Sequence, residues 1–240
     1  MTKIAIIIPS YNESENLEKL INEINSNLKN VEIFIIDDSY VDCSEKILKN
    51  QNNVNFFHRG KKLGRGSAVI FGLKESLKKN FDLFIEMDAD FSHHPNELQE
   101  KINFFLKNNL DLLISSRYLK DSRIINWSLS RRIFSKMSNF LARILLKIPV
   151  SDYTNGFRFY SKPAVELITL KCGKIGDGFI ILSEILLQLS LNQLKIGETK
   201  TNFVNRTRGE SSVNIRLIYN SLIGLIKLFF IKIRNNNKIE

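Results

Sequence analysis

Short apolar runs alternate with longer segments of helical spacing through the first half of the chain. The runs are almost continuously apolar, which is typical of strands in a parallel sheet that helices cover on both faces. This alternation predicts an α/β fold with a mostly parallel sheet. We expect strands near residues 3–8, 31–36, 54–57, 82–87 and 110–115, and helices over residues 13–28, 43–51, 65–79 and 95–107.

Beyond residue 120 the pattern changes to long helical segments. Residues 130–148 and 215–234 each combine a basic stripe with apolar residues in other directions, so both favour basic amphipathic helices. Such a helix either lies in a membrane interface or packs its apolar face on the core of the domain. The second segment, interrupted by Lys227, falls short of the roughly 20 apolar residues that a membrane span needs.

Composition narrows the class of protein. The 240 residues, 43% of them hydrophobic and 25% charged, indicate a globular chain with a sizeable core. Cys43 and Cys172 are far apart and lack the paired spacing of a metal or redox motif, so we expect neither a disulfide framework nor a zinc site. The apolar run at the start is too short for a signal peptide, from which we expect a protein on the cytosolic side.

The charge is unevenly divided along the chain. Residues 1–114 carry 14 Lys and Arg against 17 Asp and Glu, whereas residues 115–240 carry 21 against 8. A basic half attracts nucleic acid, anionic lipid or phosphorylated substrates through the same long-range field. The charge therefore indicates an anionic partner without choosing among these three.

Polar residues follow four of the predicted strands directly. Ligands of open α/β sheets bind outside the carboxyl ends of the strands, so we expect these four loops to converge on one crevice. The loops read PSYNE at 9–13, DDSYVD at 37–42, DADFSHH at 88–94 and SSRY at 115–118.

Asp88 and Asp90 lie one residue apart where a buried strand is predicted to end. In an extended segment residues i and i+2 point the same way, so the two carboxylates can reach one ligand. A divalent cation would relieve the repulsion between two unneutralised charges, and Mg²⁺ or Mn²⁺ is typically held by one or two carboxylates together with substrate phosphates. The pair therefore predicts a metal site that also holds a diphosphate, although an isolated DxD is more often a pair of solvated loop acids.

Eight motifs occur in the order seen in family-2 glycosyltransferases and most resemble the dolichol-phosphate mannosyltransferase branch. They are IPSYNE (8–13), DDSYVD (37–42), GRGSAV (64–69), DADFSHHP (88–95), SSRY (115–118), SRRIFSKMSN (130–139), SDYTNGFRFY (151–160) and NRTRGESS (205–212). Their joint order is far more specific than any one of them. The resemblance implies a GT-A fold, a mostly parallel Rossmann-like sheet flanked by helices, in residues 1–214, followed by a C-terminal amphipathic, membrane-associating helix and tail in residues 215–240.

The resemblance also implies roles for the matched residues. It implies that the nucleotide sugar is bound by Pro9, Tyr11, Glu13, Asp38, Asp88 and Ala89, and a metal ion, Mg²⁺ or Mn²⁺, by Asp88 and Asp90. It implies that the acceptor phosphate is bound by Arg117, Arg131, Ser135 and Arg206, and that the catalytic residues are Asp90, Arg117 and Arg131. Asp152, Asn155, Gly156 and Arg158 belong to the matched SDYTNGFR loop, and Glu184 matches an acid of an acceptor-side helix.

Structural alternatives stay open for several of these positions. Glu13 could be a first-turn helix acid, and the Asp37–Asp38 pair could end a strand and cap a helix. The GRG segment at 64–66 lacks the third glycine of a dinucleotide fingerprint and the Lys of a P-loop, so we interpret it as a turn with close backbone approach. His93 and His94 are interpreted as loop packing rather than as metal ligands.

We expect an inverting, metal-dependent transferase that moves mannose from GDP-mannose to a polyprenyl phosphate and yields a β-linked lipid-phosphate sugar. A phosphate monoester, with a second pKa of about 6, is already mostly ionised near neutral pH, so it attacks without a strong base. Planar guanidinium groups can hold this anionic acceptor beside an anionic donor.

Three positions depart from the branch, and they leave the sugar and the acceptor open. Ser92 and Leu182 stand where Gln is common, and Ser212 where many relatives carry Lys. One alternative is a UDP-glucose-dependent polyprenyl-phosphate glucosyltransferase. Others are a glycan or cell-wall enzyme with a hydroxyl acceptor, using Glu184 or Asp152 as the base, and a nucleotide-sugar-binding partner subunit.

The expected partners follow from the same evidence. A nucleic-acid-binding module would use the basic half, but no groove-reading motif is recognisable and we expect no nucleic-acid partner. Without an expected membrane span, the chain would bind the cytosolic face of a membrane peripherally, or through a separate membrane-protein partner.

Overall fold

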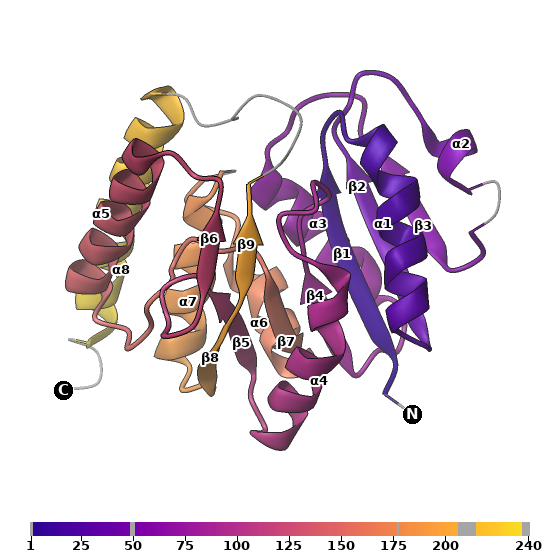
Figure 1. Ribbon diagram of the computed structural model, residues 1–240. Coiled ribbons are helices and arrows are strands. Elements are labelled where there is room, and N and C mark those ends of the chain that lie inside the picture. The colour runs from indigo at the N-terminus through magenta and orange to yellow at the C-terminus, as the bar shows by residue number, and fades with distance from the viewer. Residues whose placement is uncertain (1, 49–50, 177, 206–214, 237–240) are drawn as a thin grey trace.

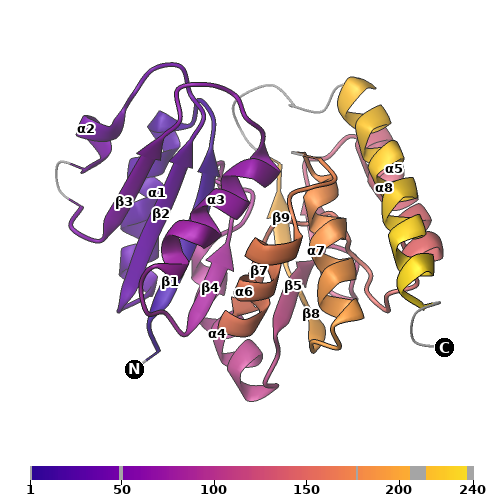
Figure 2. The same cartoon turned by 180° about the vertical axis from the view of Figure 1, so that it is seen from behind.

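The computed structural model describes residues 2–48, 51–176, 178–205 and 215–236. They form a seven-stranded sheet in the order β3-β2-β1-β4-β7-β5-β8, with helices on both faces (Figures 1 and 2). The strands are β1 (Ile4–Ser10), β2 (Val31–Asp37), β3 (Val54–His58), β4 (Leu83–Glu86), β5 (Leu112–Ser116), β7 (Arg158–Ser161) and β8 (Ile196–Lys200). A small parallel pair joins β6 (Arg123–Ile125) to β9 (Asn202–Val204).

The helices cover both faces of the sheet and lie at its two ends. On one face of the sheet lie α1 (Ser14–Asn27) and α4 (Leu98–Lys107), which follows a 3₁₀ turn at Pro95–Glu97. The other face is covered by α3 (Arg65–Leu77), α6 (Lys162–Lys171) and α7 (Ile180–Leu191) (Figure 2). At the end of the molecule beyond α7, α5 (Leu129–Leu146) and α8 (Ile215–Asn236) lie side by side, and the short α2 (Ser44–Leu48) lies by β3 at the opposite end.

The elements predicted for the first half of the chain are confirmed. The five predicted strands correspond to β1 to β5, and the predicted helices correspond to α1, α2, α3 and the turn with α4. The helix expected over 43–51 is observed at Ser44–Leu48, and residues 49–50 lie outside the described ranges. The mostly parallel sheet is also confirmed, since β7 alone among the strands of the large sheet runs antiparallel to its neighbours β4 and β5.

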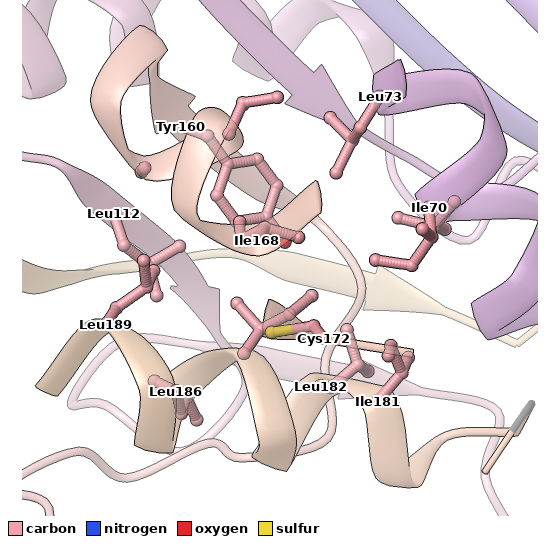
Figure 3. Close-up of a cluster of buried hydrophobic side chains, with 14 of the residues drawn as sticks. Ile70, Leu73, Leu112, Tyr160, Ile168, Cys172, Ile181, Leu182, Leu186 and Leu189 are labelled. Atoms are coloured by element: carbon pink, nitrogen blue, oxygen red, sulfur yellow. The ribbon is translucent and has the colours of Figure 1, made fainter. Parts of the chain in front are cut away.

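Two buried clusters, one on each face of the sheet, explain why the strands are continuously apolar. In β1, Ile6 and Ile8 point toward α1, while Ile7 points toward α3, and all three are fully buried. Figure 3 shows the cluster on the α3, α6 and α7 side, where Tyr160 and Leu112 of the sheet meet apolar side chains of these three helices. A strand with both faces covered has no position for a solvated side chain, so its sequence loses the usual alternation.

The expectation of only long helical segments beyond residue 120 is wrong. The second half also contributes β6, β7, β8 and β9. These strands have three to five residues each, and they carry polar or charged residues, as in IGETK and RFYS. Their pairing depends on neighbours far away in sequence, which no local periodicity reports.

The alternative in which α5 packs its apolar face on the core is also wrong. The buried residues of α5 are Asn139, Ala142 and Leu146, a narrow and partly polar stripe. The large apolar side chains exposed on α5 are Leu129, Ile133, Phe134, Met137, Phe140, Leu141 and Ile144. No helix in the described part of the chain is long and apolar enough to cross a bilayer.

Candidate functional site

The loops after β1, β2 and β4 meet at the carboxyl edge of the sheet, as the sequence predicts. Asp38 N donates to Ser10 O at 2.9 Å, and Asn12 N donates to Ser39 Oγ at 2.8 Å, so the first two loops are tied together. Met87 N donates to the carbonyl of Ile7 in β1, which draws the third loop to the same edge. The ends of parallel strands thus bring distant motifs into one place.

Asp38 anchors the loop that leads into α3. Its carboxylate is 5% exposed and accepts from Arg59 Nε at 2.6 Å, Leu63 N at 2.8 Å and Gly64 N at 3.1 Å. Asp37 ends β2, as the structural alternative holds, but Asp38 caps no helix, because its carboxylate binds residues 59–64, which precede the first turn of α3. Its contact with a nucleotide stays a prediction.

A shallow cavity of about 260 Å³ opens beside the start of α1. Glu13 is the N-cap residue of α1 and does not cap the helix with its side chain; its Oε2 accepts from Asn16 Nδ2 at 2.6 Å. Tyr11 lies two positions before Glu13 in sequence, and the Lys62 ammonium lies 4.3 Å from the centre of the Tyr11 ring. Pro9 is half-buried at the end of β1. The cavity is lined by Asn12, Glu13, Ser14, Glu15, Asn16, Ser39, Val41 and Cys43.

Asp88 is paired with an arginine that sequence reasoning passed over. Arg65, the first residue of α3, donates from Nε and Nη2 to Asp88 Oδ1 at 2.9 and 2.8 Å, and from Nη1 to Glu86 Oε1 at 2.6 Å. Burial alone would lower the pKa of Arg65, but the two carboxylates raise the pKa above its ordinary value. The premise that the DxD carboxylates stand unneutralised is therefore wrong for Asp88, because a guanidinium already balances it.

Asp90 turns back on its own loop. Its Oδ1 accepts from Ser92 N at 3.0 Å, and Ala89 between the two acids is buried. Among the described residues, neither the second oxygen of Asp90 nor Asp88 Oδ2 receives a hydrogen bond. Within the same residues, no group of three or more His, Cys, Asp and Glu side chains is disposed to hold a metal ion.

His93 is fully buried directly behind Asp88. Its Nε2 lies 2.9 Å from Asn155 Oδ1, and the Asn155 amide is oriented by donating to Ser115 O, so Nε2 carries the proton. Its Nδ1 lies 4.0 Å from Asp88 Oδ2 and has no hydrogen-bond partner. Burial lowers the pKa of His93 more than the Asp88 carboxylate raises it. The loop-packing interpretation fits its ring contacts with Phe157 and Phe203.

Arg117 and Asp152 form a buried two-pronged ion pair. Arg117 donates from Nε to Asp152 Oδ2 at 2.7 Å and from Nη2 to Asp152 Oδ1 at 2.8 Å, while its backbone N–H donates to Oδ2. Burial would raise the pKa of Asp152, but the guanidinium outweighs it and holds the pKa below its ordinary value. An ionised carboxylate locked in this way orients Arg117 and is a poor proton acceptor, which disfavours Asp152 as the base of a hydroxyl-acceptor enzyme.

Trp127 lies close to both of the predicted catalytic arginines. The guanidinium carbons of Arg131 and Arg117 lie 4.3 and 5.3 Å from its ring centre. Arg131, in the first turn of α5, also donates to Asn205 Oδ1 at 2.6 Å. Ser135, one turn later, accepts from Tyr118 Oη at 2.6 Å. Arg117, Arg131 and Ser135 are thus brought together, while Arg206 and Ser212 lie outside the described residues.

The remaining matched residues support the loop around the site. Arg158 is fully buried and donates to the carbonyls of Tyr153, Asn155 and Leu182, so it holds the 152–157 loop in shape. Glu184 accepts from Gly173 N and Lys174 N, and burial raises its pKa despite these bonds. The side chains of both Arg158 and Glu184 thus form hydrogen bonds with backbone groups, a role that the sequence motifs did not indicate.

The residues that sequence reasoning missed carried only weak signals. Arg65 stands between two glycines in a segment that the sequence predicts to be a turn, and Glu86 lies within a predicted apolar strand. Trp127 is the single tryptophan of the chain and lies just before a matched motif. Glu86 places a charge in a buried strand, and a buried charge needs a partner of opposite charge. This need was the available sign that a cation such as Arg65 lies next to it.

Comparison of sequences identifies relatives along most of the chain. The model of glycosyl transferase family 2 matches residues 5–168. A dolichol-phosphate mannosyltransferase of Pyrococcus furiosus is 37% identical over 233 residues, which cover 94% of this chain and 63% of the relative. A polyprenol monophosphomannose synthase of Mycolicibacterium smegmatis is 30% identical over 214 residues, covering 87% of this chain and 80% of the relative.

Comparison of structures confirms the GT-A fold. Glucosyl-3-phosphoglycerate synthase of Mycobacterium tuberculosis, crystallised with Mn²⁺, UDP-glucose and phosphoglyceric acid, aligns with a TM-score of 0.67 at 17% identity, over 95% of this chain and 80% of that one. The complex of the same enzyme with UDP alone gives 0.66. At this identity the likeness concerns the architecture of the sheet and its helices.

Proposed function

The chain belongs to glycosyl transferase family 2, and on that basis we propose that it transfers mannose from a nucleotide diphosphate sugar, GDP-mannose, to a polyprenyl phosphate. One observation carries the proposal: an acidic cluster and an arginine cluster meet at one edge of the sheet. His93 packs against Asp88 on one side and against Phe203 on the other, and Phe203 lies 5.4 Å from the Arg117 guanidinium. A donor diphosphate and an acceptor phosphate can therefore lie next to each other.

The acidic cluster suits a divalent cation, Mg²⁺ or Mn²⁺. Asp88 Oδ2 and one oxygen of Asp90 receive no hydrogen bond from the described residues, so two carboxylate oxygens remain for a metal ion. Because no third metal-ligating side chain is in position among those residues, phosphate oxygens and water must complete the coordination. When bound, the cation would neutralise charge that develops on the departing diphosphate.

The arginine cluster suits a phosphate nucleophile. Asp152 takes Nε and Nη2 of Arg117 and fixes the plane of the guanidinium, and no bond joins Nη1 to another described residue. An ionised acceptor phosphate needs orientation and charge balance rather than a base, and the pKa of Asp152 is lowered, as suits an orienting group. Attack in line with the leaving diphosphate would invert the anomeric centre and give a β-linked product from an α-linked donor.

The test is a transfer assay with two donors. Purified protein, a polyprenyl phosphate and Mn²⁺ or Mg²⁺ are incubated with labelled GDP-mannose or UDP-glucose, and label is counted in organic-extractable, mild-acid-labile lipid. Our proposal expects label from GDP-mannose. Label from UDP-glucose alone would assign the glucosyl alternative, and label in neither lipid fraction would contradict a lipid acceptor.

We also propose that the face formed by α5 and α8 contacts the surface of an anionic membrane peripherally. Twelve of the large apolar side chains exposed in the described residues lie on these two helices, including Met137 and Phe140 on α5 and Phe230 on α8. Neither helix contains an acidic residue, and both carry exposed Lys and Arg. Each Lys or Arg near an anionic surface contributes about 1 kcal/mol, and each buried Phe or Leu about 1.5–3 kcal/mol. Arg131 and Ser135 lie on the same α5, so lipid bound there would keep its phosphate near the site.

Vesicle sedimentation tests the membrane contact. The double change Met137→Glu and Phe140→Glu should abolish binding to vesicles of anionic and neutral phospholipid, because it puts two charges on the apolar face. Leu170→Glu is the matched control, since Leu170 is 70% exposed on α6, away from that face. Equal binding by both variants would contradict the proposed face. Binding of neither vesicles nor detergent by the wild type would point to a separate membrane-protein partner.

A further inference from the structure

The geometry points to Arg65 as a positioning residue that aims Asp88 at the cation and diphosphate. This inference rests on the proposed function, because it concerns the same donor site. Arg65 stands in none of the sets of residues that the motifs implied. What singles it out is that one guanidinium joins the strand β4, the DxD loop and the start of α3.

The two carboxylate oxygens of Asp88 have different contacts. Arg65 Nε and Nη2 both donate to Oδ1, at 2.9 and 2.8 Å, so this oxygen is fixed by two bonds from one planar group. Oδ2 faces His93 Nδ1 at 4.0 Å, which is too far for a hydrogen bond. Oδ2 is therefore left to an external ligand, in an orientation that Arg65 sets.

The guanidinium is itself held from behind. Its Nη1 donates to Glu86 Oε1 at 2.6 Å, and Glu86, with no exposed side-chain surface, accepts from Tyr160 Oη at 2.7 Å through its other oxygen. The Phe179 ring lies 5.7 Å from the guanidinium carbon. A planar fork with both ends bound cannot rotate, so it transmits the rigid position of β4 and β7 to Asp88.

Gly156 provides the space for this arrangement. A Cβ at residue 156 would lie 1.9 Å from Arg65 Nη2 and 2.7 Å from its guanidinium carbon. The glycine of the NGFR segment is therefore required by the close approach of the Arg65 side chain. Gly156 and Arg65 lie 91 positions apart in sequence, and together they set the position of the Arg65 guanidinium.

Two variants leave the net charge of the protein unchanged. They therefore test whether Arg65 positions Asp88, independently of the charge that it balances. Arg65→Lys retains a cation but loses the fork, since one ammonium cannot hold Glu86 and Asp88 in the same geometry. Gly156→Ala retains Arg65 and displaces its guanidinium. Loss of a residue that orients a metal ligand typically weakens metal affinity by about 10–100-fold, and we expect that range for both variants. Gly72→Ala is the matched control, because a Cβ there would lie 2.6 Å from Ile36 and Ile7 in the core, away from the site.

The measurement is binding of Mn²⁺ alone and of Mn²⁺ with GDP, followed by loss of the free-ion paramagnetic resonance signal, with no turnover involved. Thermal unfolding of each variant is recorded alongside. We expect weakened Mn²⁺ binding in Arg65→Lys and Gly156→Ala, and unchanged binding in Gly72→Ala even where its melting temperature falls. If wild-type protein binds Mn²⁺ and both site variants bind it equally well, the role of Arg65 is overturned while the proposed function stands. If wild-type protein binds no Mn²⁺ in either condition, the metal site of the proposed function fails. Should Gly156→Ala not fold, Arg65→Lys alone decides.

Discussion

Replacing Asp152 by Asn tests whether this acid orients Arg117 or removes a proton. Asp152 has no exposed surface, and two guanidinium nitrogens and the backbone N–H of Arg117 donate to its carboxylate. Thr154 N and Asn155 N donate to it as well, at 3.1 and 3.0 Å. Asn keeps the shape but removes the charge and points an amide donor at other donors. Leaving one partner of a buried ion pair uncompensated costs about 3–5 kcal/mol.

For a chain of this size, that loss corresponds to a fall of roughly 6–20 °C in melting temperature. The pH dependence carries a sign as well. The pKa of Asp152 is lowered in the folded state, so its contribution is present above the unfolded pKa, near 4, and is lost as the pH falls through the folded pKa. Wild-type stability should therefore drop on acidification below roughly pH 4, and the Asn variant should drop less over that range.

Urea unfolding and initial rates at varied polyprenyl phosphate provide the measurements. If Asp152 orients Arg117, the variant should show a raised acceptor KM and a reduced kcat that remains measurable. A loss of kcat by several orders of magnitude at unchanged acceptor KM would indicate a general base and refute our reasoning. Asp121→Asn, an exposed acid, serves as the control and should change stability by less than about 0.5 kcal/mol.

Three further outcomes follow from the packing and the charges. Leu186→Ala should lower the free energy of unfolding by about 2–5 kcal/mol, because Leu186 is fully buried between α7 and the sheet, and a urea melt within 1 kcal/mol of wild type would contradict this. Cys172 should resist alkylation in native protein, since burial raises the pKa of its thiol, whereas half-exposed Cys43 should react first; equal rates by mass spectrometry would count against it. Chelation with EDTA should abolish transfer yet leave the melting temperature of nucleotide-free protein unchanged, because Arg65 rather than a metal ion balances Asp88; a marked fall in that temperature would argue for a structural metal.

The sequence predicted the elements whose evidence is local. Strands β1 to β5 are buried on both faces, so their apolar runs stand out in the sequence. Helices α1 and α3, which lie between these strands in sequence, have apolar residues at helical spacing. Strand β7 did not stand out because it contains Arg158, whose buried charge is satisfied by three carbonyls of other segments. Such compensation exists only in the folded chain.

The sequence predicted which residues lie at the candidate site, but not which acidic residue pairs with which arginine. Motif order brought Asp88, Asp90, Arg117 and Arg131 to one edge. Which acid balances which arginine depends on contacts across 23 and 35 residues, namely Arg65 with Asp88 and Arg117 with Asp152. Sequence reasoning therefore assigned Asp88 an unneutralised charge and overlooked Arg65, an error that the through-space geometry corrects.

The stoichiometry of phosphorus species tests the central claim most directly. Protein, GDP-mannose, a polyprenyl phosphate and Mn²⁺ are followed together by ³¹P resonance. Our account predicts that one phosphodiester and one GDP appear for each polyprenyl phosphate consumed. Accumulation of GDP while the phosphomonoester signal stays constant would contradict a phosphate acceptor at this site.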